Sequence, residues 1–344
     1  MTLVLQIGAI LIAALFLIRA LNLIILMRWY QKPKPPGNML DVDGRRVYCT
    51  LKGEGMPTVL IEAAMGAVSP EWWMIQEEIA RNTRVLTYDR AGYGWSEPAD
   101  EPRSSEAEAA ELKELIDKLE IEGPLVLVGH SLGGLLVNHF ARLFPEMVGG
   151  VVLIDPVSPD NERFRKELPP AVFQKSGVDK VRGLKLLMWF NGFGFTRLLK
   201  RVVLKSYSPD GKLQVPAETL NVLWHHMLLP QTPRIAFAEY LQLQKQGSLV
   251  NLKASDGFPQ VPLRVITHSS EKMVDQIVRY GGLSADAARQ VETLWQELIR
   301  AHTGLAPGSR LVIAEGSGHN IHLDEPELVV KTVLELVEEV RRHQ

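Results

Sequence analysis

The sequence predicts an α/β fold with a mostly parallel central sheet flanked by helices, an inserted helical segment and an N-terminal transmembrane helix. Three observations support this prediction. Short β-branched runs alternate with helical stretches, the first thirty residues are almost wholly apolar, and residues 157–261 contain helical patterns without a convincing strand. Apolar strands that alternate with helices are typical of a parallel sheet buried on both faces.

The composition fits a folded chain with a sizeable core. The 344 residues are 46% hydrophobic and 23% charged. Thirty-eight Lys and Arg against 40 Asp and Glu leave a formal net charge of −2, so we expect no nucleic-acid partner. The single cysteine, Cys49, excludes an intramolecular disulfide and a Cys-based metal cage.

The N-terminal run from Leu3 to Met27 is long enough to cross a bilayer. Only three polar residues interrupt it, namely Gln6, Arg19 and Asn22. At roughly 1.5 Å per residue, such a helix exceeds a hydrocarbon core of about 30 Å. We therefore predict a single-pass membrane anchor over residues 1–30, in contact with the lipid bilayer, and a stiff Pro-rich linker over residues 31–38.

The flanks of this run favour an anchor over its alternatives. A cleaved signal peptide would have a basic start and a small-residue cleavage site, and a surface or core helix would be less apolar around its circumference. Trp29 and Tyr30 suit the membrane interface, and Arg28, Lys32 and Lys34 follow the span. By the positive-inside rule, we expect the part of the chain that follows the span to lie in the cytoplasm.

The remaining elements follow in order. Residues 39–51 alternate around Asp43-Gly44, the turn signal of an antiparallel hairpin. Six short strands are predicted at 58–61, 84–88, 125–128, 151–154, 263–267 and 310–314, with helices at 104–119, 135–144 and 327–342. We assign residues 39–156 and 262–344 to the core and residues 157–261 to a helical cap.

One strand runs directly into Gly129-His130-Ser131-Leu132-Gly133, a G-x-S-x-G motif followed by a helix. A serine on a sharp strand-to-helix turn needs small neighbours, because the strained backbone brings the residues two before and two after it into close contact. Ser131 is therefore the candidate nucleophile.

A serine hydroxyl needs a base to remove its proton, and His319 is the candidate. It lies in a Gly-containing loop between the last predicted strand and the terminal helix. We expect His130 and His322 to be structural. His225 and His226 are adjacent in sequence, a poor spacing for one ion, so no metal site is expected.

These motifs resemble the α/β-hydrolase superfamily from about Asp41 to the C-terminus. Residues 88–96 (YDRAGYGWS) look like the D-x-x-G-x-G-x-S block after the family's fourth strand. Gly318-His319, followed by residues 324–327 (DEPE), looks like its C-terminal histidine block. The resemblance implies a serine hydrolase of the capped, esterase- or lipase-like branch. Asp89 precedes a glycine-rich turn, and we expect Asp89 and Arg90 to fix that loop by hydrogen bonds.

The resemblance also implies an oxyanion hole made of two backbone amides. Carried over, these are the N–H groups of Leu132 and Met65, with residues 63–66 aligned on the family's H-G-x-x stretch. The chain departs from the family pattern here, because Glu62-Ala63-Ala64 replaces the H-G pair. A backbone donor survives such side-chain replacement.

Two residues compete for the acid that orients His319. Glu271 aligns with the family's G-x-x-D-x-x-V segment after the seventh strand, with Glu for Asp and His268 for the glycine. Asp155 closes the preceding strand, a location that members resembling dehalogenases use. The residue patterns leave both open.

Serine at position 131 argues against the aspartate-nucleophile dehalogenases and epoxide hydrolases, which leaves acyl transfer. We predict hydrolysis of a small-molecule ester with an apolar or lipid-like acyl part, since residues 186–195 and 222–229 are aromatic and apolar. The alternatives are a thioesterase, an amidase, a carbon–carbon hydrolase, an acyltransferase, a cofactor-free oxidoreductase, or a membrane-tethered binding protein without catalysis. No cofactor motif is visible, and none is expected.

Overall fold

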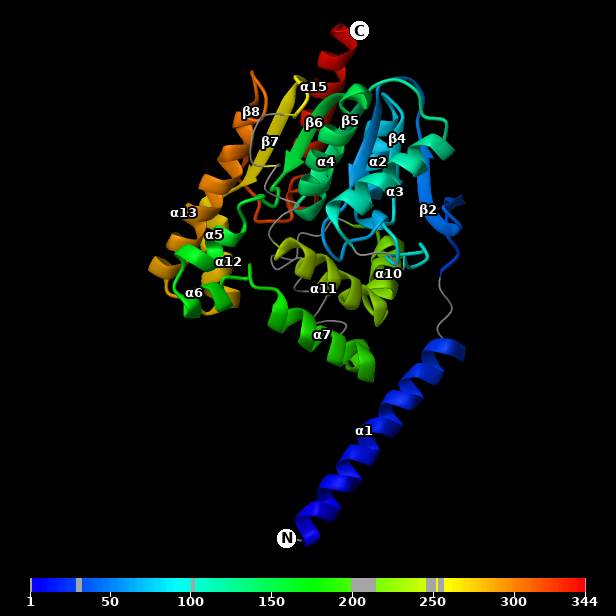
Figure 1. Ribbon diagram of the computed structural model, residues 1–344, viewed down its shortest axis with the longest axis vertical. Helices are drawn as coiled ribbons and strands as arrows, with labels where there is room; N and C mark the ends of the chain where they lie inside the picture. The colour runs from blue at the N-terminus through cyan, green and yellow to red at the C-terminus, as the bar shows by residue number, and fades with distance from the viewer. Residues whose placement is uncertain are drawn as a thin grey trace.

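The computed structural model describes residues 2–28, 33–99, 103–198, 215–245, 252 and 257–343. An eight-stranded sheet in the order β1-β2-β4-β3-β5-β6-β7-β8 forms its centre (Figure 1). The strands are β1 (Asn38–Val42), β2 (Arg45–Lys52), β3 (Thr58–Glu62), β4 (Val85–Tyr88), β5 (Leu125–His130), β6 (Val148–Ile154), β7 (Leu263–His268) and β8 (Arg310–Ala314). This arrangement confirms the predicted fold class.

The two N-terminal strands are antiparallel and the rest of the sheet is parallel. β1 and β2 form the predicted hairpin, in which Asp43 and Gly44 both have positive φ values of 51° and 72°. Two successive residues of positive φ form the turn whose twist matches paired strands.

Helices cover both faces of the sheet because the strands are apolar on both sides. One face packs against α3 (Ser105–Lys118), α4 (Leu132–Leu143) and α13 (Ala285–Ala301), and the other against α2 (Trp73–Ala80) and α15 (Pro326–Arg342). Helix α12 (Ser270–Gly281) packs on α13 beside the sheet. Short 3₁₀ turns lie at Ser69–Trp72, Pro145–Met147 and His302–Gly304, and α14 is Ile321–Asp324.

The described residues between β6 and β7 form helices and contain no strand. These inserted helices are α5 (Glu162–Glu167), α6 (Pro170–Lys175), α7 (Val181–Phe193), α8 (Phe195–Leu198), α10 (Ala217–Met227) and α11 (Gln231–Leu243). Helices α7, α10 and α11 lie below the sheet in Figure 1, and α7 and α11 line a cavity together with loops at the carboxyl edge of the sheet.

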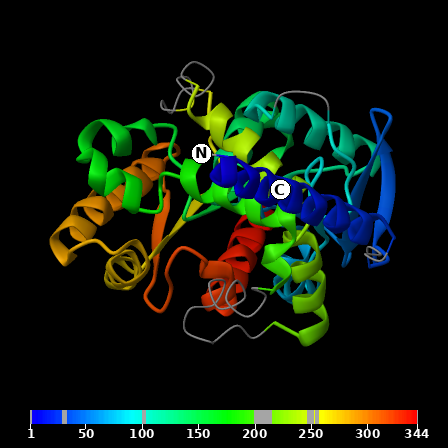
Figure 2. The ribbon, with the colours of Figure 1, turned by 90° about the horizontal axis from the view of Figure 1, so that it is seen from below.

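Helix α1 (Thr2–Arg28) projects away from this body (Figure 1) and crosses in front of it when viewed from below (Figure 2). Its segment Leu3–Ile25 is long and apolar enough to span a membrane, and nearly all of it is exposed. Asn22 is the buried exception: its side-chain amide donates to the carbonyls of Asn191 (3.2 Å) and Gly192 (2.9 Å) on α7. Trp29, Tyr30 and Lys32 lie outside the described residues.

Candidate active site

Ser131 occupies the sharp turn between β5 and α4, with a φ of 54°. The glycines of the motif are required by close backbone contacts. A Cβ on Gly133 would lie 2.3 Å from the carbonyl oxygen of Glu62, and a Cβ on Gly129 would lie 2.4 Å from that of Gly133. The turn therefore holds the Ser131 hydroxyl at the carboxyl edge of the sheet and at the N-terminus of α4, where the helix dipole favours negative charge.

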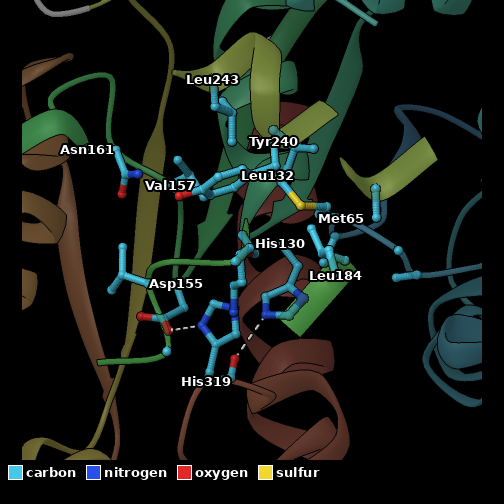
Figure 3. Close-up of a pocket in the computed structure, with 18 of the residues that line it drawn as sticks. Met65, His130, Leu132, Asp155, Val157, Asn161, Leu184, Tyr240, Leu243 and His319 are labelled. Carbon is cyan, nitrogen blue, oxygen red and sulfur yellow. Dashed lines mark hydrogen bonds and ion pairs between the residues drawn. The ribbon is translucent and has the colours of Figure 1, made fainter. Parts of the chain in front are cut away.

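The structure brings Ser131, His319 and Asp155 together from three different loops. His319 Nε2 lies 3.1 Å from Ser131 Oγ. On the other side of the ring, His319 Nδ1 lies 2.5 Å from Asp155 Oδ2, the contact drawn as a dashed line in Figure 3. Because Nδ1 donates to the carboxylate, Nε2 is left with a lone pair facing the hydroxyl. Burial alone would raise the pKa of Asp155, but the charge and hydrogen bond of His268 and the hydrogen bond of His319 hold that pKa well below its usual value.

The two candidate acids have different environments. Asp155 is 1% exposed at the end of β6, with a φ of 43° that turns its side chain out of the strand. Glu271 is exposed at the start of α12 and is not among the residues that line the cavity beside Ser131. The sequence patterns do not distinguish Asp155 from Glu271. In the structure, Asp155 is the one of these two carboxylates that contacts His319.

His130 and His322 pack beside the loop that carries His319. His130 Nε2 donates to the backbone carbonyl of His319 at 2.9 Å. His322 is buried and stacks on Trp72, with ring centroids 4.4 Å apart. Both rings are therefore part of the packing that places the His319 loop.

Met65 and Leu132 both line the cavity next to Ser131 (Figure 3). The loop that carries Met65 is fixed by Arg90, whose guanidinium donates to the carbonyls of Ala63 (2.7 Å) and Ala64 (2.9 Å). Arg90 also holds its own glycine-rich loop, as expected, because its carbonyl accepts from the backbone N–H of Tyr93 at 2.9 Å, but its side chain reaches the loop after β3. Asp89 fixes its own loop by accepting from the backbone N–H of Trp95, and it connects that loop to the 3₁₀ turn at Ser69 by accepting from the Ser69 N–H.

Glu62, the residue directly before the stretch aligned on H-G-x-x, contacts the same arginine. Glu62 is buried and pairs with Arg90 at 2.6 Å, and it accepts from the hydroxyl of Tyr88. Glu239 of α11 pairs with Arg90 on another side, at 3.1 Å, and accepts from the Tyr93 hydroxyl at 2.8 Å. This buried cluster connects an inserted helix to the loop of Met65, and sequence patterns did not reveal it.

A cavity of about 440 Å³ opens over Ser131, between the sheet edge and the inserted helices. Its walls are mostly apolar. They include Leu187 of α7. Figure 3 labels further lining residues, namely Met65 and Leu132 from the core, Leu184 from α7, and Tyr240 and Leu243 from α11.

Within the part of the chain that the structure describes, no group of three or more His, Cys, Asp and Glu side chains could hold a metal ion. His225 and His226 are both buried in α10, and the His226 ring packs edge-on against Trp95 with centroids 4.4 Å apart.

The sheet topology and the loops gathered at its carboxyl edge are those of an α/β hydrolase. The sequence model of the alpha/beta hydrolase family matches residues 64–332 of this chain. The chain therefore belongs to this family, and it is a hydrolase. An AB hydrolase superfamily protein of Gibberella zeae is 24% identical over 295 residues, which cover 83% of this chain and 87% of the relative.

Solved structures share the fold at low sequence identity. An esterase of Exiguobacterium antarcticum superimposes with a TM-score of 0.58 and 17% identity, covering 88% of this chain and 99% of the other. The epoxide hydrolase CorEH superimposes with a TM-score of 0.61 and 19% identity, covering 88% and 98%. At these identities the similarity shows the fold alone, so the chemistry must be argued from the site.

Proposed function

We propose that the protein is a serine hydrolase that cleaves a carboxylic ester through an acyl-enzyme on Ser131. The observation that carries the proposal is the contact series Ser131–His319–Asp155, with 3.1 Å and 2.5 Å between the partners. An ionised Asp155 keeps the proton of His319 on Nδ1, and Nε2 then accepts the Ser131 proton as Oγ attacks the ester carbonyl.

Both half-reactions use the same groups. The tetrahedral oxyanion is held by the backbone N–H groups of Leu132 and Met65, each such donor being worth about 3 kcal/mol of barrier. When the intermediate collapses, His319 gives its proton to the leaving alcohol. Water then attacks the acyl-enzyme, with His319 as base, and the acid product leaves.

The cavity supports an apolar acyl group. Aliphatic side chains of α7 and α11 line it, and binding sites for apolar ligands are mostly apolar with a few placed polar groups. Thioester, amide or carbon–carbon cleavage and acyl transfer would use the same three residues. A binding protein without catalysis is less well supported, because it would have no need of a serine held in strained backbone against a histidine.

We further propose that α1 anchors the protein in a lipid bilayer with the catalytic domain on the cytoplasmic side. The exposed apolar surface of α1 supports this, as does its contact with α7 through Asn22. Helix α7 also exposes Leu186 (56%) and Trp189 (46%), while its Leu184 and Leu187 line the cavity. The same helix would then face the membrane surface and the acyl group, which favours a lipid-like substrate.

A panel of p-nitrophenyl esters of increasing acyl length tests the proposed chemistry. We expect Ser131→Ala to abolish turnover and Asp155→Asn to lower kcat by roughly 10⁴-fold, as loss of the orienting carboxylate does in serine hydrolases. Glu271→Gln is the matched control and should retain full activity. Equal losses in the two acid variants, or full activity of Ser131→Ala, would refute the proposal.

A further inference from the structure

His268 contacts the oxygen of Asp155 that His319 does not use. It is the last residue of β7, its side chain is fully buried, and its Nδ1 lies 2.6 Å from Asp155 Oδ1. On the other side of the ring, Nε2 lies 3.0 and 3.2 Å from the two carboxylate oxygens of Glu292 on α13. The contact series from Ser131 therefore continues inward past Asp155 to His268 and Glu292.

These contacts determine how His268 is protonated. An ionised carboxylate only accepts hydrogen bonds, so a ring placed between two carboxylates must donate from both nitrogens, and the ring is an imidazolium. Burial by itself lowers the pKa of His268, but the charge and hydrogen bond of Asp155, and then those of Glu292, raise it to about 10.

Uncharged groups surround the remaining sides of His268 among the residues that the structure describes. Trp295 of α13 packs edge-on, with ring centroids 5.5 Å apart, and the Gln296 amide donates to the His268 carbonyl at 3.4 Å. The Gln296 side chain also bonds Thr267, and the backbone N–H of Ser269 donates to Ser317. Of the described side chains, Asp155 and Glu292 form the ion pairs of this ring.

We propose that His268 and Glu292 are positioning residues that fix the Asp155 carboxylate for catalysis, an inference that rests on the proposed serine chemistry. Because His268 occupies Oδ1, the carboxylate cannot rotate without breaking a buried bond, and Oδ2 stays directed at His319. Glu292 balances the charge. When His319 takes the serine proton, two imidazolium ions face two carboxylates, whereas without Glu292 a single carboxylate would be shared between two cations.

The protonation state can be measured directly on the intact wild-type protein. In ¹⁵N-histidine NMR, with His268 assigned by its loss in His268→Gln, both ring nitrogens should carry protons from about pH 6 to about pH 9. Glu292→Gln should bring the titration of His268 down into that range. A wild-type ring that is neutral at about pH 7 would overturn the inference.

Kinetics test the positioning role. In His268→Gln an amide can still donate to Asp155 but carries no charge. We expect kcat to fall roughly 10- to 100-fold with little change in KM, the usual range for a group behind a ligating or catalytic side chain. The acid limb of the pH profile should move to higher pH, because the cation that opposes protonation of His319 is gone. Glu297→Gln, an exposed glutamate on the same helix, is the control and should change neither quantity.

The outcomes separate this inference from the function on which it rests. If wild-type Ser131 forms no adduct with a fluorophosphonate, the proposed function fails. If it does, and His268→Gln and Glu292→Gln keep wild-type kcat and the wild-type acid limb, the positioning role is refuted. A lower kcat with an unmoved acid limb also refutes it, because a purely structural defect would give that result.

Discussion

At the scale of single residues, strained or crowded backbone marks the site. Ser131 and Asp155 both have positive φ values, which non-glycine residues rarely adopt, and both lie at carboxyl ends of neighbouring strands. The serine could be found from sequence because its turn demands glycines at fixed positions. The acid could not, since a carboxylate at the end of either β6 or β7 satisfies the pattern, and only the fold decides which one contacts His319.

Gly133→Ala tests the crowding argument. Its Cβ would lie 2.3 Å from a backbone oxygen, so the turn must shift, and we expect loss of activity with a lower melting temperature. Gly183→Ala on α7 is the matched control, because a Cβ there meets nothing within 4 Å. In a helix the control should be neutral or stabilising, by up to about 1 kcal/mol. Thermal unfolding and ester turnover of both variants decide the question, and an active Gly133→Ala protein would contradict the argument.

His268 predicts an alkaline loss of stability. Its pKa is about 10 in the folded protein against an ordinary value of 6.5, so folding binds a proton. The stabilisation of the folded state by this proton is complete below about pH 6.5 and is lost as the pH rises through about 10. Urea unfolding across this window should show the difference in free energy between wild type and His268→Gln shrinking with pH. A constant difference would mean that His268 does not hold its extra proton.

At the scale of elements, the sequence predicted what local patterns determine. The hairpin, the parallel strands and the terminal helix follow from the Asp43-Gly44 turn, β-branched runs and helical spacing. The buried ion pairs were not predicted, because Glu62, Arg90 and Glu239 come from separate elements and charge alone does not indicate burial. The available signals were two departures from the family pattern. Glu62-Ala63-Ala64 replaces the H-G pair before the oxyanion loop, and His268, at the end of β7, replaces a glycine.

Arg90 connects the inserted helix α11 to the oxyanion loop, which gives an element-scale prediction. Lysine cannot bond two carbonyls and two carboxylates at once, so Arg90→Lys should leave a buried carboxylate poorly compensated. We expect a destabilisation of about 3–5 kcal/mol, as for other broken buried pairs, together with a lower kcat. Arg46→Lys, in the exposed pair with Glu97, is the control and should change little. Unchanged chemical denaturation of Arg90→Lys would show that the cluster does not hold the loop.

At the scale of the whole molecule, α1 is joined to the rest chiefly through α7. The sheet and its helices have their own core clusters, in which α1 takes no part. We therefore expect a chain that lacks residues 1–28 to fold, to hydrolyse short soluble esters and to fail to float with liposomes, whereas the full chain floats. If the full chain remains soluble and does not float, the membrane proposal is wrong.

The central claim is that the Ser131 hydroxyl is activated by His319. It is tested most directly by treating the intact protein with a fluorophosphonate and mapping the adduct by mass spectrometry, since only an activated serine reacts. The account predicts a single adduct on Ser131 that disappears in His319→Gln and persists in Ser270→Ala, an exposed serine at the start of α12. An unlabelled Ser131, or equal labelling with and without His319, would contradict it.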